Sequence, residues 1–184
     1  MKSGKSMNII KANRNQYEDV RNFYYSMIDA MSGSTVYVGW QKDIYPSAEF
    51  LGDSVRKGEL YLVLEDENIT AAMVFNHDHN EGYDEINWPT KADDSEVMII
   101  HALGVHPDYY GKGYAKALVR EAINMARESG IKAIRLDVLE GNIPAEKLYS
   151  GFGFQYTDKV RMFYEDTGWT NFKLFEYRIL GCYE

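Results

Sequence analysis

The sequence predicts an α/β fold built on a mixed central sheet. Helical and β-rich patterns alternate along the chain, which is typical of α/β proteins. Residues 59–65 and 69–76 are β-rich runs separated by a short polar turn, which predicts an antiparallel pair. Further on, a strand, a helix and a second strand predict a βαβ unit with a right-handed crossover and parallel strands. These three segments are residues 96–105, 113–129 and 132–139.

Length and composition favour a single globular domain. The chain has 184 residues, of which 45% are hydrophobic, and it contains three tryptophans. A chain of this size can bury a sizeable core, and its length favours one domain over two. Residues 1–6 are short and polar, so we expect them to be a vector-derived leader, with Met7 as the native start. The domain is then expected to span residues 7–184.

The first part of the chain predicts a short strand followed by two helices. Residues 8–12 are the strand. Residues 15–31 carry apolar side chains at close to helical spacing, which predicts the first helix. The second helix is expected to open at Pro46 and Ser47, with the Ser47 side chain as its cap, and to end near Gly58.

The second half of the chain surrounds the βαβ unit with further elements. A long polar loop is expected over residues 77–94, before the unit. Within the unit, Gly130 is expected to stop the helix. A short helix over 143–150 and a strand over 152–157 follow, and a final strand over 171–180 comes after a loop.

Charge and cysteine content narrow the possible functions. The formal net charge is −8, whereas a protein that binds nucleic acid needs clustered lysine and arginine to release phosphate counterions. We therefore expect no nucleic-acid partner, and an acidic surface suits a cationic or amine-bearing partner better. The single cysteine, Cys182, leaves no disulfide framework, which fits a reducing, cytoplasmic location. No run approaches the roughly 20 apolar residues of a membrane span, so no membrane partner is expected.

Gly111 and Gly113 lie where a predicted strand passes into a predicted helix. The first backbone N–H groups of a helix have no partner within it and lie at the positive end of its dipole. An anion can bind there if no side chain blocks its approach, and two glycines leave the approach open. Lys112 and Lys116 would add positive charge. Glycines at this spacing also occur in plain tight turns, so the surrounding motifs have to decide between the two interpretations.

Two nucleotide-binding patterns fit the chain less well. Residues 4–6, Gly-Lys-Ser, lack the preceding glycine and the preceding strand of a Walker phosphate loop. A dinucleotide fold is closer, because Gly111 and Gly113 follow a strand and Asp137 ends the next strand, where that fold places a ribose ligand. It fails at the third glycine position, which holds Lys116, and in the N-terminal half, where a hairpin replaces the parallel units.

Three motifs in the second half of the chain belong together. They are residues 101–107 (HALGVHP), 110–115 (YGKGYA) and 142–154 (NIPAEKLYSGFGF). They resemble the GNAT superfamily of acyl-CoA-dependent N-acyltransferases, and the resemblance covers the chain from about Met7 to Leu180. The core pattern of that family is Gln or Arg, two residues, Gly, one residue, then Gly or Ala. Gly113 and Ala115 match it, while Tyr110 departs from its first position.

The resemblance implies a fold with a mixed sheet of about six or seven strands and helices on both faces. It also implies acetyl-CoA as the acyl donor and no metal. In the family, the strand before the turn carries a bulge whose open backbone groups pair with the pantetheine arm. The polar side chain lost at Tyr110 leaves the backbone donors untouched, so we expect diphosphate binding to survive. The residues expected to contact the coenzyme are Leu103, Gly104, Val105, Tyr110, Gly111, Lys112, Gly113, Tyr114, Ala115, Lys116, Asn142 and Tyr149.

Asn142 and Tyr149 are seven residues apart, so both project from one side of the short predicted helix. When an amine attacks an acetyl thioester, the departing thiolate must be protonated or held by a donor, and a phenol can do this. In family members the matching tyrosine donates a proton to the coenzyme sulfur, and the matching asparagine contacts the coenzyme. By that resemblance Tyr149 is the general acid. Taken alone, the two residues would be interpreted as a core tyrosine and a helix-capping asparagine.

The general base is left open between a histidine, a carboxylate and water. An amine is mostly protonated at neutral pH, so a proton must leave before or during its attack. His101 is the first candidate because its ordinary pKa lies in the working range. Alternation along its strand places it on the same face as Leu103, and Glu96, on the other face, is the fallback. A histidine in an apolar strand is more often a hydrogen-bonded core residue.

Aromatic and acidic side chains outside the motifs are candidates for the acceptor site. Trp40, Tyr45, Glu85 and Trp88 are the predicted acceptor residues, since aromatic rings and carboxylates suit a cation. Plain core packing would explain the tryptophans equally well. Residues 77–79, His-Asp-His, have no third ligand at a suitable spacing, so they predict a solvated turn rather than a metal site.

The sequence therefore predicts direct transfer of an acetyl group from acetyl-CoA to a primary amine of a small molecule or a peptide. A covalent acyl-cysteine route is not expected, because Cys182 lies far from the motifs. The alternative is a catalytically silent acyl-CoA-binding sensor or regulatory module, and a nicotinamide-linked enzyme ranks third. Homodimers are common among similar proteins, although no feature of this sequence requires one.

Overall fold

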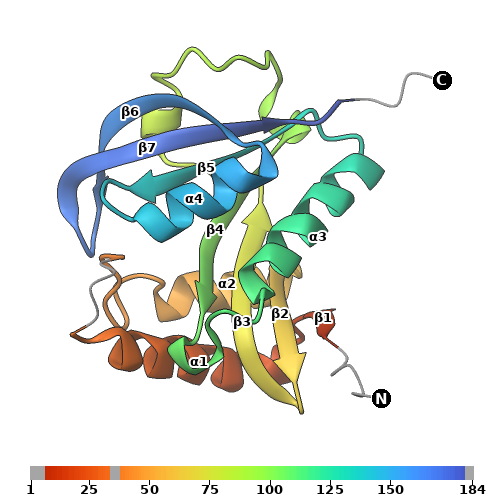
Figure 1. Ribbon diagram of the computed structural model, residues 1–184, viewed down its shortest axis with the longest axis vertical. Coiled ribbons are helices and arrows are strands. Elements are labelled where there is room, and N and C mark those ends of the chain that lie inside the picture. The colour runs from red at the N-terminus through yellow and green to blue at the C-terminus, as the bar shows by residue number, and fades with distance from the viewer. Residues whose placement is uncertain (1–6, 34–37, 181–184) are drawn as a thin grey trace.

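Seven strands form one mixed sheet in the part of the chain that the computed structural model describes, residues 7–33 and 38–180 (Figure 1). Their order across the sheet is β1-β2-β3-β4-β5-β7-β6. The strands are β1 (Asn8–Lys11), β2 (Leu60–Glu65), β3 (Asn68–Asn76), β4 (Val97–Val105), β5 (Ala133–Leu139), β6 (Gln155–Tyr164) and β7 (Gly168–Arg178). The α-helices are α1 (Tyr17–Met31), α2 (Ala48–Lys57), α3 (Tyr114–Glu128) and α4 (Ile143–Phe152). The predicted α/β fold with a mixed sheet is confirmed.

Strand direction follows the predicted units. Every neighbouring pair of these strands is antiparallel except β4 and β5. β2 and β3 form the predicted hairpin, with Glu65 opposite Asn68. β4 and β5 are parallel and are connected through α3, which confirms the βαβ unit. β7 lies between β5 and β6, so the last hairpin of the described chain forms one edge of the sheet.

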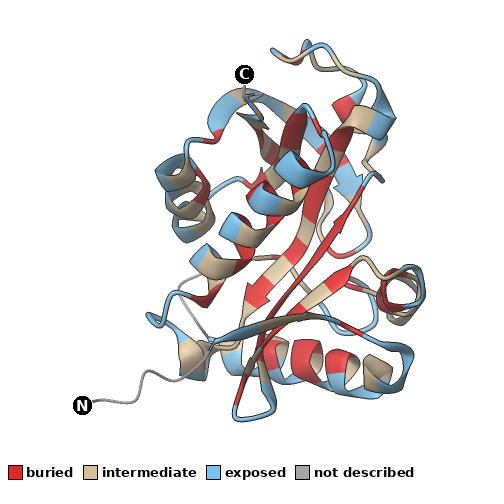
Figure 2. Ribbon diagram, turned by 90° about the vertical axis from the view of Figure 1, so that its right-hand side faces the viewer, coloured by how far each residue is buried: buried red, intermediate tan, exposed pale blue. Residues whose placement is uncertain are grey.

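The helices cover the two faces of the sheet in pairs. α3 and α4 pack on one face, and α1 and α2 pack on the other (Figure 1). β3 shows the consequence for the sequence: Ala71, Met73 and Phe75 face the α3 side, while Ala72 and Val74 face the α1 side. Buried residues accordingly run through the central strands and along the inward sides of the helices (Figure 2). Such strands appear in the sequence as continuous apolar runs.

Local signals set the helix ends. The Ser47 hydroxyl accepts a hydrogen bond from the Phe50 N–H at 3.1 Å, and the left-handed Gly58 ends α2, both as predicted. α1 begins at Tyr17, slightly later than predicted, because Asn13 first caps a short 3-10 turn. Among the described residues, no helix has the length and apolar content to cross a membrane.

The C-terminal hairpin differs from the prediction. The predicted strand after α4 is present, but its predicted bounds, residues 152–157, are wrong, because Phe152 is the last residue of α4 and the left-handed Gly153 ends that helix. β6 starts only at Gln155 and continues to Tyr164. β7 begins at Gly168, so the turn between the two strands is shorter than expected. α4 continues through Phe152 because Gly153 is the residue that adopts the positive φ at which the helix ends.

β4 carries one extra residue near its end. His101 pairs with Val74 and Gly104 pairs with Ala72, so three steps along β4 oppose two along β3. Ala102 adopts a φ of 47°, which is unusual for a residue that has a Cβ. A bulge is therefore present at the place that the family resemblance implies.

The bulge changes which residues of β4 face which side. Sequence alternation places His101 and Leu103 on the same face, and this is wrong. The His101 ring meets the Phe50 ring of α2, whereas Leu103 packs in the cluster under α3. The Tyr24 hydroxyl of α1 donates a 2.7 Å hydrogen bond to the Ala102 carbonyl, and the Tyr24 side chain is fully buried. α1 therefore holds the bulge in place.

Replacing Tyr24 by phenylalanine is expected to lower the free energy of unfolding by about 1–3 kcal/mol, because the buried Ala102 carbonyl would lose its side-chain donor. Urea denaturation of the variant and the wild type measures this difference. Tyr61→Phe is the matched control, since Tyr61 is half-buried and its hydroxyl bonds to no described residue. That control should change stability by less than about 0.5 kcal/mol. Equal losses in the two variants would contradict the role given to Tyr24.

Candidate active site

β4 and β5 separate within the sheet. They pair only from Val97 with Ala133 to Ile99 with Arg135. Beyond these residues, β4 pairs with β3 and β5 pairs with β7, but the two strands no longer pair with each other. Their facing backbone edges can therefore accept another partner.

A cavity of about 110 Å³ lies where the two strands separate. It is bounded by β4, β5, α4, the segment around residue 40 and the β6–β7 turn. Its aromatic walls are Trp40, Tyr45, Tyr149, Tyr164 and Phe172. Two carboxylates, Asp137 and Asp166, also line it, and no lysine or arginine stands among its described lining residues. The cavity is thus aromatic and acidic.

The cavity brings together most of the predicted catalytic and acceptor residues. Those that line it are His101, Leu103, Asn142, Tyr149, Trp40 and Tyr45. They come from β4, from α4 and from the segment before α2, which meet only in the folded chain. Glu85 and Trp88, the other predicted acceptor residues, do not line it.

Glu85 and Trp88 lie on the long loop between β3 and β4. Glu85 is exposed. Trp88 is buried, its indole N–H donates to the Tyr83 carbonyl at 2.8 Å, and the Arg135 guanidinium lies 4.3 Å from its ring centroid. Trp88 therefore packs the loop against the sheet. An acceptor role for either residue stays a prediction.

A buried ion pair fixes the end of the same loop. Arg135 Nε lies 2.9 Å from Glu176 Oε2, and the two side chains are 11% and 3% exposed. The Thr90 N–H donates to Glu176 Oε1, and Arg135 Nη2 donates to the Thr90 carbonyl, both at 2.9 Å. These hydrogen bonds offset the cost of burying the pair. β5 and β7 consequently hold the loop that carries Tyr83.

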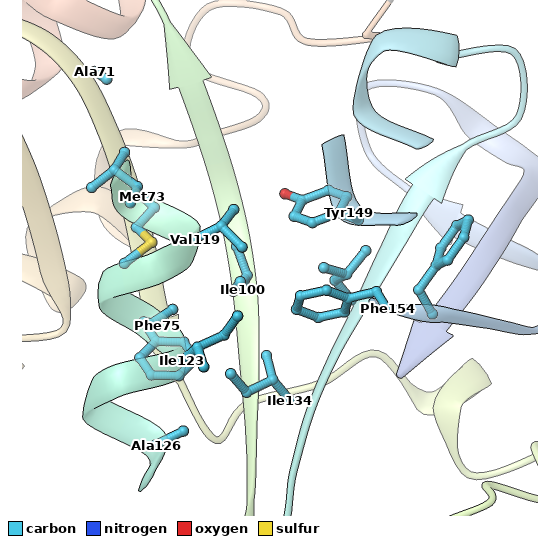
Figure 3. Packing of buried hydrophobic residues seen from close by; sticks show 14 of the residues in the cluster. Ala71, Met73, Phe75, Ile100, Val119, Ile123, Ala126, Ile134, Tyr149 and Phe154 are labelled. Atoms are coloured by element: carbon cyan, nitrogen blue, oxygen red, sulfur yellow. The ribbon is translucent and has the colours of Figure 1, made fainter. Parts of the chain in front are cut away.

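Tyr149 presents a phenol to the cavity. Its side chain is 6% exposed, and its ring packs edge-on against Phe154 with the centroids 5.5 Å apart. Figure 3 shows the phenol oxygen turned toward β4. This hydroxyl forms no hydrogen bond with any described residue. Burial raises the pKa of Tyr149 above its ordinary 10.0, so the phenol stays protonated at neutral pH.

Asn142 has the capping role that its sequence neighbours suggest. Its Oδ1 accepts a hydrogen bond from the Ala145 N–H at 3.3 Å, at the start of α4, and Pro144 lies within the first turn. Asn142 also lines the cavity. Capping and coenzyme contact are therefore compatible roles for this residue.

His101 is held as a neutral ring. Its Nε2 lies 2.8 Å from the Asp78 carbonyl oxygen. Because a carbonyl only accepts, Nε2 carries a proton and donates, so the lone pair of the neutral ring lies on Nδ1. Burial lowers the pKa of His101 below its ordinary 6.5, although the charge of Asp137 acts in the opposite direction.

Glu96, the fallback base, lies at the other end of β4. It ends a short 3-10 turn, and its carboxylate pairs with Lys132 at 2.8 Å. The hydrogen bond from Lys132 lowers the pKa of Glu96. Glu96 does not line the cavity, so its position gives no support to a catalytic role.

Asp137 is a cavity carboxylate for which the sequence predicts no role beyond that of a ribose ligand in a dinucleotide fold. Its Oδ2 accepts hydrogen bonds from the Tyr83 hydroxyl at 2.9 Å and the Tyr164 hydroxyl at 3.0 Å. Burial raises the pKa of Asp137 above its ordinary 3.8, while these hydrogen bonds lower it. The signal in the sequence is a carboxylate between Leu136 and Val138, inside an apolar strand, where an aspartate needs buried partners.

The glycine turn before α3 is open. Gly111 and Gly113 adopt φ values of 78° and 84°, which favour glycine. No heavy atom lies within 4 Å of the place where a Cβ would stand on either residue. α3 begins at Tyr114, so the first amides of the helix follow directly. These residues fit an anionic group such as a diphosphate.

Lys112 is paired within this turn. Its Nζ lies 3.0 Å from Glu65 Oε2, and the Tyr114 hydroxyl donates to the same carboxylate. Glu65 is 7% exposed, so the end of β2 anchors the turn from below. Lys116, on the first turn of α3, is exposed, and so is Tyr110. Part of the positive charge expected here is thus balanced by Glu65.

His77 and His79 contact separate partners. His77 Nδ1 lies 2.6 Å from the Val97 carbonyl, and His79 Nε2 lies 3.0 Å from Asp84 Oδ1. Within the described ranges, no group of three or more ligating side chains gathers that could hold a metal ion. The absence of a metal stays a prediction.

Sequence comparisons agree on one family. The profile of the acetyltransferase (GNAT) family matches residues 20–154. YycN, an uncharacterized N-acetyltransferase of Bacillus subtilis, is 43% identical over 65 residues, which are 35% of this chain and 42% of that protein. The N-alpha-acetyltransferase RimI of Mycobacterium tuberculosis is 36% identical over 69 residues, which are 38% of this chain and 42% of that protein. The similarity therefore spans less than half the length of these relatives.

Solved structures share the fold over nearly the whole chain. An acetyltransferase of the GNAT family from Streptococcus agalactiae has a TM-score of 0.77 and 18% identity, over 95% of this chain and 96% of that chain. YncA of Salmonella typhimurium, solved with its cofactor acetyl-CoA, has a TM-score of 0.69 and 14% identity, over 97% of each chain. At such identities the likeness concerns the fold, and it confirms the predicted architecture.

His101 is expected to titrate with a midpoint below 6.5, because burial disfavours the imidazolium form. NMR of its ring protons across a pH series measures the midpoint, and His101→Gln identifies the resonance. Since the folded pKa lies below the unfolded one, His101 should reduce stability as the pH falls below about 6.5 and have no such effect above it. A midpoint at or above 6.5 would show that burial does not control this ring.

Proposed function

Because the chain belongs to the acetyltransferase (GNAT) family, we propose that it transfers the acetyl group of acetyl-CoA directly to a primary amine of a small molecule or a peptide. The observation that supports this most is the cavity between β4 and β5, which is lined by the Tyr149 phenol together with aromatic and acidic side chains. The relative named as an N-alpha-acetyltransferase is consistent with an amine acceptor.

Separate parts of the chain would hold the donor. The amides at Gly111 and Gly113, with those that begin α3, would bind the diphosphate. Lys116 would add positive charge, whereas the charge of Lys112 is balanced by Glu65. The unpaired edge of β4 at residues 103–105 would bond to the amides of the pantetheine arm. The bound donor supplies a thioester whose carbonyl carbon an amine can attack.

Tyr149 is the proposed general acid. A free thiol has a pKa of about 8.5 and a phenol one of about 10, so the phenol holds the departing thiolate by a hydrogen bond and gives up its proton as the far more acidic attacking nitrogen loses one. Burial keeps the Tyr149 phenol protonated, and no described residue competes for its hydroxyl. Asn142 lies two turns away on the same helix and would contact the donor beside it.

Trp40 and Tyr45 are the proposed walls of the acceptor site. Their ring centroids lie 6.0 Å apart with an interplanar angle of 64°. Both rings line the cavity, and such faces attract a cation. His101, whose Nδ1 keeps its lone pair, stays a predicted base on the β4 side.

Tyr149→Phe is expected to lower kcat by about 10²-fold or more, because the leaving thiolate would lose its proton donor. The dissociation constant for CoA should stay within about twofold, since the phenol ring remains in place. Thiol release from acetyl-CoA with a panel of polyamines, aminoglycosides, amino acids and peptides measures the rate. Tyr156→Phe, at an exposed tyrosine of β6, is the matched control and should retain full activity. An unchanged rate in Tyr149→Phe would remove the general-acid role.

The same assay separates an enzyme from a silent sensor. A sensor would gain thermal stability with CoA but release no thiol with any amine in the panel. A nicotinamide-linked protein would respond to NAD and not to CoA. Turnover of any amine by the wild type supports the proposed transfer.

Gly113→Ala is expected to weaken CoA binding at least about tenfold, because a Cβ at this positive φ would disturb the backbone that faces the diphosphate. Isothermal titration calorimetry measures the affinity. Gly130→Ala is the matched control, since Gly130 also has a positive φ and open surroundings but lies at the far end of α3. Both changes should cost about 1–2 kcal/mol of stability, whereas only Gly113→Ala should affect CoA. Equal affinities in the two variants would place the diphosphate elsewhere.

A further inference from the structure

Asp137 is a half-buried carboxylate without a cationic partner in the described chain. It lies in the middle of β5, opposite Leu174 of β7, and lines the cavity. No lysine, arginine or histidine of the described ranges lies within ion-pair distance of it, in contrast to Glu176 nearby, which pairs with Arg135. A buried carboxylate is costly unless a cation or several donors compensate it.

The two donors of Asp137 leave one of its oxygens open. The Tyr83 and Tyr164 hydroxyls, at 2.9 Å and 3.0 Å, both donate to Oδ2. Oδ1 accepts no hydrogen bond from any described residue. The carboxylate is therefore fixed by one oxygen, while the other keeps its lone pairs for a group in the cavity.

Other residues that line the cavity are also acidic or aromatic. Asp166, 9% exposed, adds a second carboxylate, and no described lining residue is a lysine or arginine. The Tyr149 phenol, 6% exposed and without a partner among the described residues, lines the same cavity. Trp40 and Tyr45 add aromatic faces. Two carboxyl groups, aromatic walls and a phenol without a hydrogen-bond partner among the described residues together favour a cationic occupant.

We propose that Asp137 binds the acceptor as a primary alkylammonium ion through Oδ1 and then takes its proton, with Tyr83 and Tyr164 as positioning residues. This proposal rests on the proposed acetyl transfer. It adds that the acceptor binds as a cation and that Asp137 is the residue that binds it. Acceptors with a free carboxylate next to the amine are expected to be poor, because Asp137 and Asp166 repel a second negative charge.

The proton and bond changes balance. Asp137 takes one proton from the ammonium ion, and the resulting amine nitrogen forms a C–N bond with the thioester carbonyl carbon while the C–S bond breaks. Tyr149 gives its phenol proton to the leaving sulfur, and the phenolate takes the second proton that the nitrogen loses. Asp137 then releases its proton to solvent. The products are the amide, the free thiol and one proton.

His101 offers a different chemistry. Its neutral ring can accept a proton at Nδ1 but carries no charge with which to select an ammonium ion over a neutral amine. Asp137 can do both. The two residues therefore predict different effects on acceptor binding, even though either could lower turnover when replaced.

The test measures binding of ethylammonium chloride to protein saturated with CoA, by isothermal titration calorimetry. The wild type is expected to bind this ion, and Asp137→Asn, which keeps the shape of the side chain, should bind it at least about tenfold more weakly. Asp158→Asn, at an exposed aspartate of β6, is the matched control and should bind like the wild type. Equal affinity in the wild type and Asp137→Asn, or no binding by the wild type, overturns the proposal.

Turnover provides the second readout and separates the two proposals. Asp137→Asn should lose about 10²-fold or more in kcat/KM for ethylamine while binding CoA normally. The wild type should prefer glycinamide to glycine at least about tenfold, and equal use of both overturns the proposed acceptor class. If the wild type binds CoA and ethylammonium but acetylates no amine, acetyl transfer fails while the ammonium site stands.

A pH profile tests the positioning residues and covers the case in which Asp137→Asn does not fold. Tyr83→Phe and Tyr164→Phe each remove a hydrogen bond that lowers the pKa of Asp137, so the acid limb of kcat/KM should move to higher pH. A purely structural role would lower the rate without moving this limb. An acid limb that stays in place in both variants overturns the proposal. The titratable groups that face Asp137 are Tyr45, Tyr83, His101, Tyr149, Tyr164 and Asp166.

Discussion

The separation of two parallel strands is the constraint on which the rest of this site depends. In a continuous sheet each strand uses the backbone groups of its neighbour. Here the pairing of β4 with β5 stops at Ile99 and Arg135, and the extra residue at Ala102 re-aims the strand beyond that point. An edge thus arises in the middle of the sheet, where helices cover it on both sides. Such an edge is shielded from other strands but can be reached by a slender, amide-bearing ligand.

The glycine turn before α3 and the cavity favour ligand groups of opposite charge. The turn before α3 offers uncovered N–H groups to an anion, whereas the cavity offers carboxylates to a cation. Glu65 is acidic and yet lies at the anion end. The Glu65 carboxylate pairs with Lys112 and accepts a hydrogen bond from the Tyr114 hydroxyl. Its charge is therefore balanced within the turn and does not repel a bound anion. The overall acidity of the chain therefore does not conflict with binding a diphosphate.

Local chemistry decided what the sequence could predict. The open turn at Gly113 was predictable because glycine alone adopts that backbone conformation readily. Helical spacing placed Tyr149 on the same side as Asn142, but its proposed role came from the family resemblance. Alternation failed past Ala102, since one inserted residue shifts the phase of a strand. Trp88 shows that aromatic composition does not distinguish a pocket wall from packing. The apolar neighbours of Asp137 indicate that it needs partners but not which ones, because its two donors lie 54 and 27 residues away along the chain.

Those long separations also fix the order in which the site can form. β7 lies between β5 and β6, so Tyr164, at the end of β6, belongs to a hairpin that joins β5 only through the last described strand. Arg135 holds Thr90, and with it the loop of Tyr83, only together with Glu176 of β7. During synthesis the glycine turn before α3 can fold while the chain is still being made, whereas the surroundings of Asp137 are complete only once β7 has inserted. A ribosome-bound intermediate that stops short of β7 would therefore present the open glycine turn before Tyr83 and Tyr164 have reached Asp137.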